Sequence, residues 1–266
     1  MLGIRGHPPI WNEARFGIEL TSLLRDPVFR GEGVPQGAGQ PVLLVPGFLA
    51  GDDSLGLMTR WLRRAGYRAY VGGIRSNVDC GAAMIERLTR RRELLAEREE
   101  RRVAIVGQSR GGGLARVIAV RRPDLVSGIV TLGTPHADPM AVHPLVALHV
   151  AAVGLLGTLG FPGLFKSSCR DGGCCETVRR DLAATFPARV GFHSLYSRID
   201  GIVDWRACLD RGARHFEVRS SHCGMGVHPE AYRLLGDLLP TFREARKESA
   251  GLAPSTAGES WLRGVA

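Results

Sequence analysis

Short apolar runs alternate with helix-like segments along most of the chain, and no other feature of the sequence constrains the fold as strongly. The strand-like runs lie at 42–45, 67–71, 103–106, 126–132, 191–196 and 215–218. Helix-like patterns follow at 55–64, 84–95, 110–121, 176–186 and 229–239. Strands that alternate with helices are joined by right-handed crossovers. We therefore predict an α/β fold with a mostly parallel central β-sheet and helices on both faces.

The pattern divides the chain into three parts. With 266 residues and 44% hydrophobic content, the chain can bury one large core or two small ones. We expect the α/β domain over 41–240, preceded by an N-terminal helical extension at 1–40. The last residues, 245–266, have the composition of a flexible tail.

The extension contains a short amphipathic pattern. Its apolar residues fall on one predicted helical face and are Phe16, Leu20, Leu23 and Leu24. Asp26-Pro27 ends this helix, because proline disfavours helical backbone at the residue before it. We expect this helix to be an appendage to the domain.

The net charge of +9 raises the question of a nucleic-acid partner. The cations are nearly all arginine, with Lys166 and Lys247 the only lysines, and many stand beside Asp or Glu. A basic arm carrying aromatic residues is missing from the sequence, so we interpret the charge as solvated helix faces and expect no nucleic-acid partner. The first residues lack the apolar core of a secretory signal, which favours a cytoplasmic protein.

The cysteines do not form a recognisable framework. Cys169, Cys174 and Cys175 are close together in the sequence, and Cys208 and Cys223 follow later. Their spacing does not match a zinc site built from C-x-x-C pairs. We therefore expect free thiols and neither a metal nor a cofactor, and a local disulfide is the alternative.

A single hydroxyl group occupies the corner between a strand and a helix. The segment Gly107-Gln108-Ser109-Arg110-Gly111 follows the apolar run 103–106 and opens a helix. Such a turn exposes the serine at the carboxyl edge of the sheet and directs helix N-terminal amides at developing negative charge. The crowded backbone needs small residues two before and two after the serine. We predict Ser109 as a nucleophile; a glycine corner with an idle serine is the alternative.

A serine nucleophile of this type needs an acid and a histidine later in the chain, in loops that follow strands. Asp200 lies where the chain leaves the strand 191–196, and Asp204 is a second candidate. His222 lies in the loop after 215–218, beside Cys223. The remaining candidate histidines fit less well and are His143, His149, His193 and His228. We predict that Asp200 and His222 complete the catalytic group.

Two backbone amides are needed to hold the negatively charged oxygen of the reaction intermediate. The N–H of Arg110, which follows the nucleophile, is one candidate. The second is the N–H of Phe48, because Gly47 lets the loop after the first strand turn close to the substrate. For the Arg110 side chain we expect a surface salt bridge, and recognition of an anionic substrate is the alternative.

These segments together resemble the α/β-hydrolase fold and, within it, the bacterial lipase/esterase branch. The matching segments are V-P-G-F at 45–48, G-Q-S-R-G-G at 107–112, L-G-T-P-H at 132–136, Y-S-R-I-D-G-I-V at 196–203 and S-S-H-C-G-M at 220–225. The resemblance implies hydrolysis of a carboxylic ester through an acyl-enzyme on Ser109. The chain departs from many relatives in having Pro46 and Gln108 where histidine is frequent, and this leaves the substrate class open.

An apolar stretch at 145–165 interrupts the alternation of strands and helices. It is nearly long enough to span a bilayer, but a span there would separate Ser109 from Asp200 and His222. We therefore expect a lid or cap over about 137–175, able to touch a lipid surface transiently. A buried core helix is the alternative.

The predicted protein is thus a serine hydrolase of the esterase/lipase kind that acts on a small-molecule or lipid ester. An acyltransferase or a thioesterase with the same catalytic residues is an alternative, as is a non-catalytic binding protein on the same fold. A nucleotide-binding domain is disfavoured, because the chain lacks both G-x-G-x-x-G after the first strand and a G-K-[ST] phosphate loop.

Overall fold

The structure is a computed structural model that describes residues 8–170 and 172–243. The expected tail at 245–266 lies outside the described residues. Six strands form one sheet in the order β2-β1-β3-β4-β5-β6, and every neighbouring pair is parallel. The strands are β1 Pro41–Val45, β2 Arg68–Val71, β3 Val103–Gln108, β4 Val126–Leu132, β5 Gly191–Tyr196 and β6 Arg214–Glu217. The predicted parallel sheet is confirmed.

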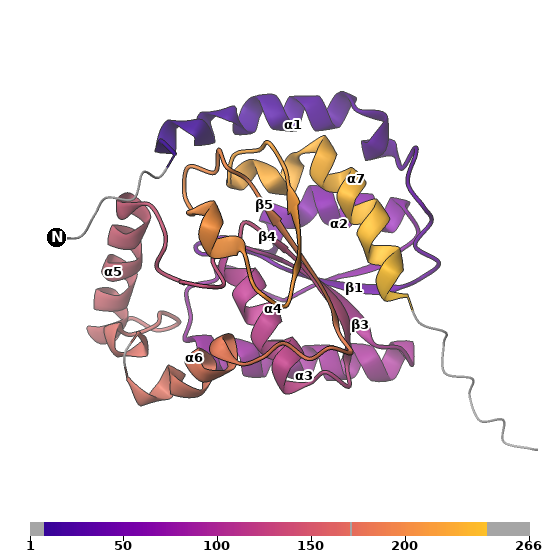
Figure 1. Cartoon of the computed structure of the whole chain (residues 1–266). Coiled ribbons are helices and arrows are strands. Elements are labelled where there is room, and N and C mark those ends of the chain that lie inside the picture. The colour runs from indigo at the N-terminus through magenta and orange to yellow at the C-terminus, as the bar shows by residue number, and fades with distance from the viewer. Residues whose placement is uncertain (1–7, 171, 244–266) are drawn as a thin grey trace, which may run out of the picture.

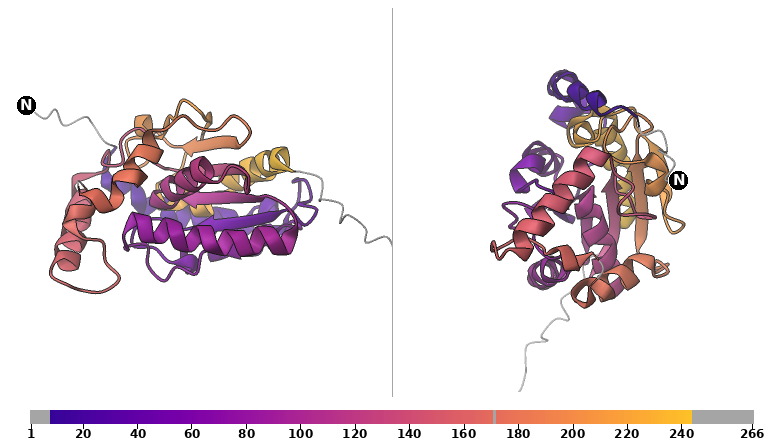
Figure 2. Two further views of the ribbon diagram at one scale, coloured as in Figure 1. Left: turned by 90° about the horizontal axis from the view of Figure 1, so that it is seen from below. Right: turned by 90° about the vertical axis from the view of Figure 1, so that its left-hand side faces the viewer.

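Helices cover both faces of this sheet (Figures 1 and 2). One face carries α1 Phe16–Arg25, α2 Gly56–Arg64 and α7 Pro229–Leu238. The other carries α3 Gly81–Glu99, α4 Arg110–Arg121 and α6 Glu176–Ala183. The central strands β1, β3 and β4 are buried along their whole length. Parallel strands covered on both faces are continuously apolar for this reason, which is why the sequence pattern identified them.

Two hydrophobic clusters, one on each side of the sheet, form the core. On the side of α2 and α7, the rings of Trp61 and Tyr232 pack 4.8 Å apart, and the Trp61 indole N–H donates to the Val28 carbonyl oxygen. On the other side, Met84 of α3 and Ile118 of α4 are fully buried against the strands. These clusters hold the sheet rigid beneath its carboxyl edge.

The strand register brings the functional loops to one edge of the sheet. Val45 at the end of β1 pairs with Gly107, and Gln108 at the end of β3 pairs with Leu132 at the end of β4. Leu132 pairs in turn with Leu195 of β5. The loops that follow β1, β3, β4 and β5 therefore open side by side.

The N-terminal helix α1 ends at Arg25, where Asp26-Pro27 was predicted to end it, but its apolar side chains are not all buried. Leu23 is fully buried, but Phe16 and Leu24 of the predicted apolar face are 39% and 49% exposed. The acidic residue Glu19 is instead 4% exposed. The helix turns the Glu19 carboxylate toward a loop of the domain, where backbone and hydroxyl groups bind it.

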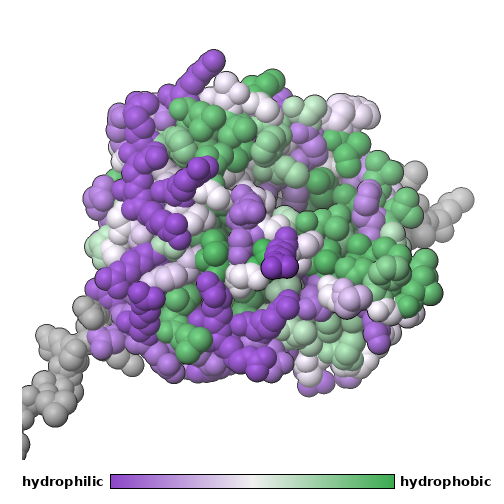
Figure 3. Space-filling view, turned by 180° about the vertical axis from the view of Figure 1, so that it is seen from behind, coloured by the Kyte–Doolittle hydropathy of each residue, from purple (hydrophilic) through white to green (hydrophobic). Residues whose placement is uncertain are grey.

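The apolar insertion forms a helix, α5 Pro144–Thr158, that lies outside the two layers (Figure 1). Large apolar side chains remain exposed on and just after it, namely Leu145, Leu148, Leu155, Leu156, Leu159 and Phe161. They form the apolar area on the right of Figure 3. A buried core helix is therefore excluded. Within 8–170 and 172–243, none of the helices has both the length and the apolarity needed to cross a bilayer.

Candidate active site

Ser109 occupies a strained corner between β3 and α4. Its φ of 51° and ψ of −123° put it in a region that residues other than glycine rarely adopt, and such strain concentrates at functional sites. The corner is held on both sides, because the Ser109 N–H donates to Leu132 at 2.8 Å and the Thr134 hydroxyl donates to the Ser109 carbonyl at 3.0 Å. The side chain is thus fixed at the carboxyl edge of the sheet.

The glycines around Ser109 are required by close backbone packing. A Cβ atom at Gly107 would lie 2.6 Å from the Cα of Gly112. At Gly111 it would lie 2.2 Å from the Val45 carbonyl oxygen, and at Gly112 it would lie 2.0 Å from Oγ1 of Thr134. Each distance is well inside van der Waals contact, so α4 can start directly beneath β1 and β4 only without these side chains.

Asp200 and His222 form a buried pair. Nδ1 of His222 lies 2.7 Å from Oδ2 of Asp200, and the two side chains are 6% and 1% exposed. The other carboxylate oxygen of Asp200 accepts from the N–H groups of Ile202 and Val203 at 2.8 and 2.7 Å. These bonds fix the carboxylate, which in turn orients the imidazole.

The alternative acid, Asp204, lies four positions later and has a different role in the structure. Its Oδ1 accepts from the Arg206 N–H at 3.0 Å and so caps a short 3-10 helix, Trp205–Cys208. The structure brings Asp200, and not Asp204, into contact with His222.

The pKa of His222 is set by two opposing effects. Burial of the ring disfavours its charged form and lowers the pKa, but the carboxylate of Asp200, through charge and a hydrogen bond, raises it. The charge of Glu13 adds to this, and the result is a pKa above the ordinary 6.5. The pair is therefore suited to hold a proton that His222 receives.

Gln108, the last residue of β3, links the Ser109 corner to the His222 loop. The Gln108 amide donates to the His222 carbonyl oxygen at 3.2 Å. A Cβ added at Gly133, just after β4, would lie 3.0 Å from Nδ1 of His222 and 3.2 Å from Oδ2 of Asp200. Among the described residues, a direct hydrogen bond between Oγ of Ser109 and His222 is not formed. The three predicted residues nevertheless come from neighbouring loops at one edge.

The loop after β1 lies against Ser109. A Cβ at Gly47 would be 3.2 Å from the Ser109 Cβ. Asn77 supports this loop, because its amide donates to the Pro46 carbonyl at 2.8 Å and its backbone forms a parallel bridge with Phe48. The segment that carries Phe48 therefore lies beside Ser109, which Arg110 follows directly in the chain.

The Arg110 side chain does not make the expected surface salt bridge. Its guanidinium donates to the backbone carbonyls of Asn77, at 2.6 Å, and Asp79. Burial lowers the pKa of this group. The side chain ties the start of α4 to the loop before α3, and that inward direction is why the expectation is wrong.

Two carboxylates from the N-terminal extension hold the His222 loop, and sequence reasoning missed both. Glu13 accepts from the N–H groups of Gly201, His222 and Cys223 at 3.0, 2.9 and 2.9 Å. Glu19 accepts from the N–H and the hydroxyl of Ser221 at 2.8 and 2.6 Å. For Glu19 the only signal in the sequence was its place as an acidic residue within an apolar helical pattern, and Glu13, which precedes that pattern, had none.

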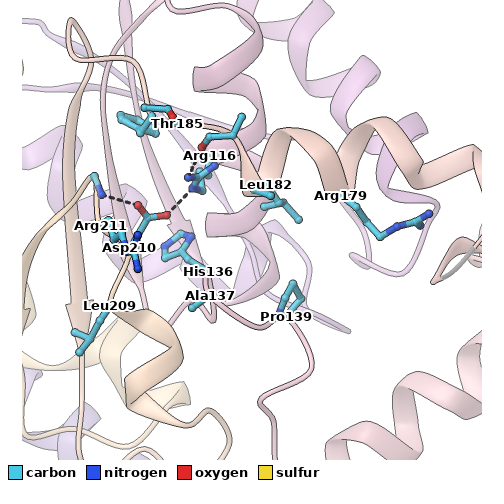
Figure 4. Close-up of a pocket in the computed structure, with 14 residues that line it drawn as sticks. Arg116, His136, Ala137, Pro139, Arg179, Leu182, Thr185, Leu209, Asp210 and Arg211 are labelled. Atoms are coloured by element: carbon cyan, nitrogen blue, oxygen red, sulfur yellow. Dashed lines mark hydrogen bonds and ion pairs between the residues drawn. The ribbon is translucent and has the colours of Figure 1, made fainter.

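A cavity of about 700 Å³ lies elsewhere on the surface, between the segment after β4, α6 and the loop before β6 (Figure 4). Arg116 and Asp210 point toward each other there and form an ion pair at 2.6 Å. His136 lines the same cavity and shares a hydrogen bond of 3.0 Å with Thr131. Burial lowers the His136 pKa to about 3, so the ring is neutral at ordinary pH. Arg116 and Asp210 satisfy each other, whereas Nδ1 of His136 has no hydrogen-bond partner among the described residues. The cavity is lined by neither Ser109 nor His222.

Comparison with known proteins gives short sequence matches and extensive structural ones. No protein-family model matches the chain. A stretch of 105 residues is 30% identical to the triacylglycerol lipase of Pseudarthrobacter phenanthrenivorans and covers 36% of this chain and 33% of that lipase. The triacylglycerol lipase of Burkholderia plantarii matches equally, over 29% of its length. The matched stretch is thus a third or less of these curated relatives.

Among solved structures, the mature lipase BlEst2 of Bacillus licheniformis superposes with a TM-score of 0.58 at 16% identity, covering 78% of this chain and 94% of the lipase. A metagenomic carboxyl esterase superposes with a TM-score of 0.56 at 16% identity, covering 86% of this chain and 91% of its own. A soluble variant of the monoglyceride lipase of Saccharomyces cerevisiae gives 0.55 at 13% identity, over 80% and 91%. The chain has the α/β-hydrolase fold, which it shares with these lipases and esterases.

Proposed function

We propose that this protein hydrolyses carboxylic esters through an acyl-enzyme on Ser109. The observation that carries the proposal is the buried Asp200–His222 pair, which lies at the same sheet edge as the strained Ser109. A glycine corner with an idle serine would need neither a positive φ at the serine nor a buried imidazole–carboxylate pair beside it. The likeness to lipase and esterase structures supports the same reaction class.

The proposed mechanism assigns one task to each group. His222, with its Nδ1 proton held by Asp200, has Nε2 available to accept the proton of the Ser109 hydroxyl as the oxygen attacks the ester carbonyl. The backbone N–H groups of Phe48 and Arg110 stabilise the oxyanion of the tetrahedral intermediate. The intermediate expels the alcohol, which takes the proton from His222. Water then repeats the sequence on the acyl-enzyme and releases the acid.

The substrate side of the proposal is an ester with an apolar acyl group. The exposed leucines of α5 supply an apolar surface on the segment that follows β4. Phe165, which follows α5, packs 6.2 Å from the ring of Phe48 and thus reaches the proposed oxyanion loop. We propose that this insertion acts as a lid, and that it meets the lipid or the acyl chain.

The test is hydrolysis of p-nitrophenyl esters of increasing acyl length by the wild type, Ser109→Ala and the exposed control Ser54→Ala. We expect Ser109→Ala to lose about 10³-fold or more in kcat with an unchanged circular dichroism spectrum, and Ser54→Ala to retain activity. A fluorophosphonate should label Ser109, as read by mass spectrometry of the peptide. Absent turnover on every ester together with absent labelling would refute the proposal. Labelling with acyl transfer but without hydrolysis would favour the acyltransferase.

A further inference from the structure

Four cysteine side chains meet outside the candidate active site. They are Cys80, at the start of α3, and Cys169, Cys174 and Cys175, from the segment between α5 and α6. Their sulfur atoms all lie within 4.8 Å of one another. We call them the four-cysteine cluster. All six cysteines fall in the described part of the chain, and all six are free thiols.

The sulfur positions match a tetrahedral metal site. Zinc binds thiolate at about 2.3 Å, so the sulfurs of a tetrahedral Cys₄ site are about 3.8 Å apart. The Cys80–Cys175 and Cys174–Cys169 sulfur pairs are each 3.5 Å apart. A disulfide would need about 2.05 Å and would join two sulfurs only. An iron–sulfur cubane is larger than one ion and would hold its four sulfurs farther apart.

The surrounding chain is arranged to hold this cluster. Arg179 of α6 donates to the carbonyl oxygens of Cys169, Arg170 and Gly172 and so closes the loop that carries three of the sulfurs. The Phe165 N–H donates to the Val78 carbonyl at 2.7 Å, which brings this segment beside the approach to Cys80. The first-turn amides of α3 also face the cluster, and positive helix ends stabilise thiolates.

A positively charged group lies beside the cluster. Four thiolates around one divalent ion would carry two net negative charges. The guanidinium of Arg110 lies close to the cluster and interacts with the charges of Cys175, Cys80 and Cys169. It supplies a partly buried positive charge beside the negatively charged metal–thiolate complex.

We propose that the four-cysteine cluster binds one Zn²⁺ as a structural site. Soft thiolate ligands in a tetrahedral set select zinc among the common divalent ions. Four protein sulfurs fill the coordination sphere and leave no position for water, so the ion takes no part in ester hydrolysis. The ion joins the end of the α5 insertion to the start of α3. The expectation of no metal arose because Cys80, the fourth ligand, lies far from the other three in the sequence.

Few side chains of the cluster segment are buried. Between α5 and α6 the chain forms only two three-residue 3-10 helices, Ser167–Cys169 and Gly173–Cys175. Cys175 is the only buried residue within them. Small segments of this kind commonly depend on a bound metal for their structure.

The experiment is elemental analysis of the untagged protein purified with a thiol reductant, before and after incubation with zinc and gel filtration. We expect one zinc per chain, released stoichiometrically by a mercurial thiol reagent. Cobalt substitution should give the thiolate-to-cobalt charge-transfer and ligand-field bands of a tetrahedral sulfur site.

The variants Cys80→Ser and Cys174→Ser should lose the metal. Cys174 is exposed, so its variant keeps the test valid if Cys80→Ser does not fold. Cys223→Ser, outside the cluster, should retain the zinc.

Three results would overturn the proposal. Folded wild type that is metal-free and remains so after incubation with zinc would exclude the site. Disulfides within the cluster, found by alkylation and peptide mass spectrometry before reduction, would replace it with a redox pair. One iron per chain would refute the zinc assignment. None of these readouts depends on ester hydrolysis, so the proposal stands or falls separately from the proposed function.

Discussion

The carboxylate of Glu13 accepts a hydrogen bond of 2.9 Å from the backbone N–H of His222. The same side chain accepts from Gly201, next to Asp200, and from Cys223. Glu13, which precedes α1, therefore joins the two loops that carry the candidate acid and base. The N-terminal extension is part of the candidate site's support and not an appendage to the domain.

Glu13→Ala should impair catalysis more than binding. Without the carboxylate, the partly buried N–H groups of Gly201 and His222 lose their acceptor, at a cost of about 1–3 kcal/mol for each group left unsatisfied, whereas the exposed N–H of Cys223 can bind water. We expect kcat to fall by about 10- to 100-fold while KM changes little, because Glu13 does not touch the substrate. Steady-state kinetics and urea unfolding measure the two effects. Glu32→Ala, which removes an exposed carboxylate from the same extension, is the matched control. A loss of stability with unchanged kcat would show that Glu13 has only a structural role.

The two aspartates after β5 should behave differently. Asp200→Asn keeps the shape of the side chain but removes the charge beside His222, and we expect kcat to fall by about 10³- to 10⁴-fold. Asp204→Asn retains an oxygen that can cap the following 3-10 helix, so its kcat should stay within a few-fold of wild type. Both variants are compared on one soluble ester after checking their melting temperatures. A larger loss for Asp204→Asn would reassign the acid.

The pH dependence of kcat/KM follows from the direction of the His222 pKa. The base must be neutral to accept a proton, so activity should rise with pH through a folded-state pKa above 6.5. The contribution of His222 to folding stability changes with pH in the opposite direction. A raised folded pKa means that protonated His222 stabilises the fold fully below pH 6.5, and this contribution is lost as pH rises through the folded value. Glu13→Gln removes one supporting charge and should move the acidic limb of the rate profile to lower pH. An unmoved limb would contradict the role of Glu13.

Local patterns predicted the elements, and long-range contacts decided the rest. The buried strands and the corner at Ser109 could be identified because their apolar runs and glycines reflect contacts within a few residues or across one sheet. The contacts of Glu13 and Glu19 with the His222 loop join segments some 200 residues apart, and one sequence carries no signal for such pairs. Cys80 was missed for the same reason. Arg110 was misjudged because its carbonyl partners are backbone groups, which no residue pattern displays.

Neighbouring glycines at the start of α4 provide a matched pair of variants. An alanine Cβ at position 112 would lie 2.0 Å from Oγ1 of Thr134, so Gly112→Ala should displace Ser109 and destabilise the protein by several kcal/mol. At position 113 the nearest atom is 3.9 Å away. Gly113→Ala should therefore stabilise the helix by about 0.5–1 kcal/mol. Urea unfolding monitored by circular dichroism measures both changes. Equal effects of the two substitutions would contradict the close packing of α4 against the corner.

The exposed leucines of α5 should matter most at a lipid surface. Leu148 and Leu155 are 64% and 57% exposed, and transferring such side chains into lipid contributes about 1.5 kcal/mol or more each. We expect Leu148→Ser with Leu155→Ser to weaken adsorption to phospholipid vesicles by about 10-fold or more. The ratio of activity on an emulsified long-chain ester to activity on a dissolved short-chain ester should fall with it. Leu94→Ser, on an equally exposed leucine of α3, is the control and should leave the ratio unchanged. If both variants behave alike, the apolar surface of α5 has no interfacial role, and the lid proposal would be withdrawn.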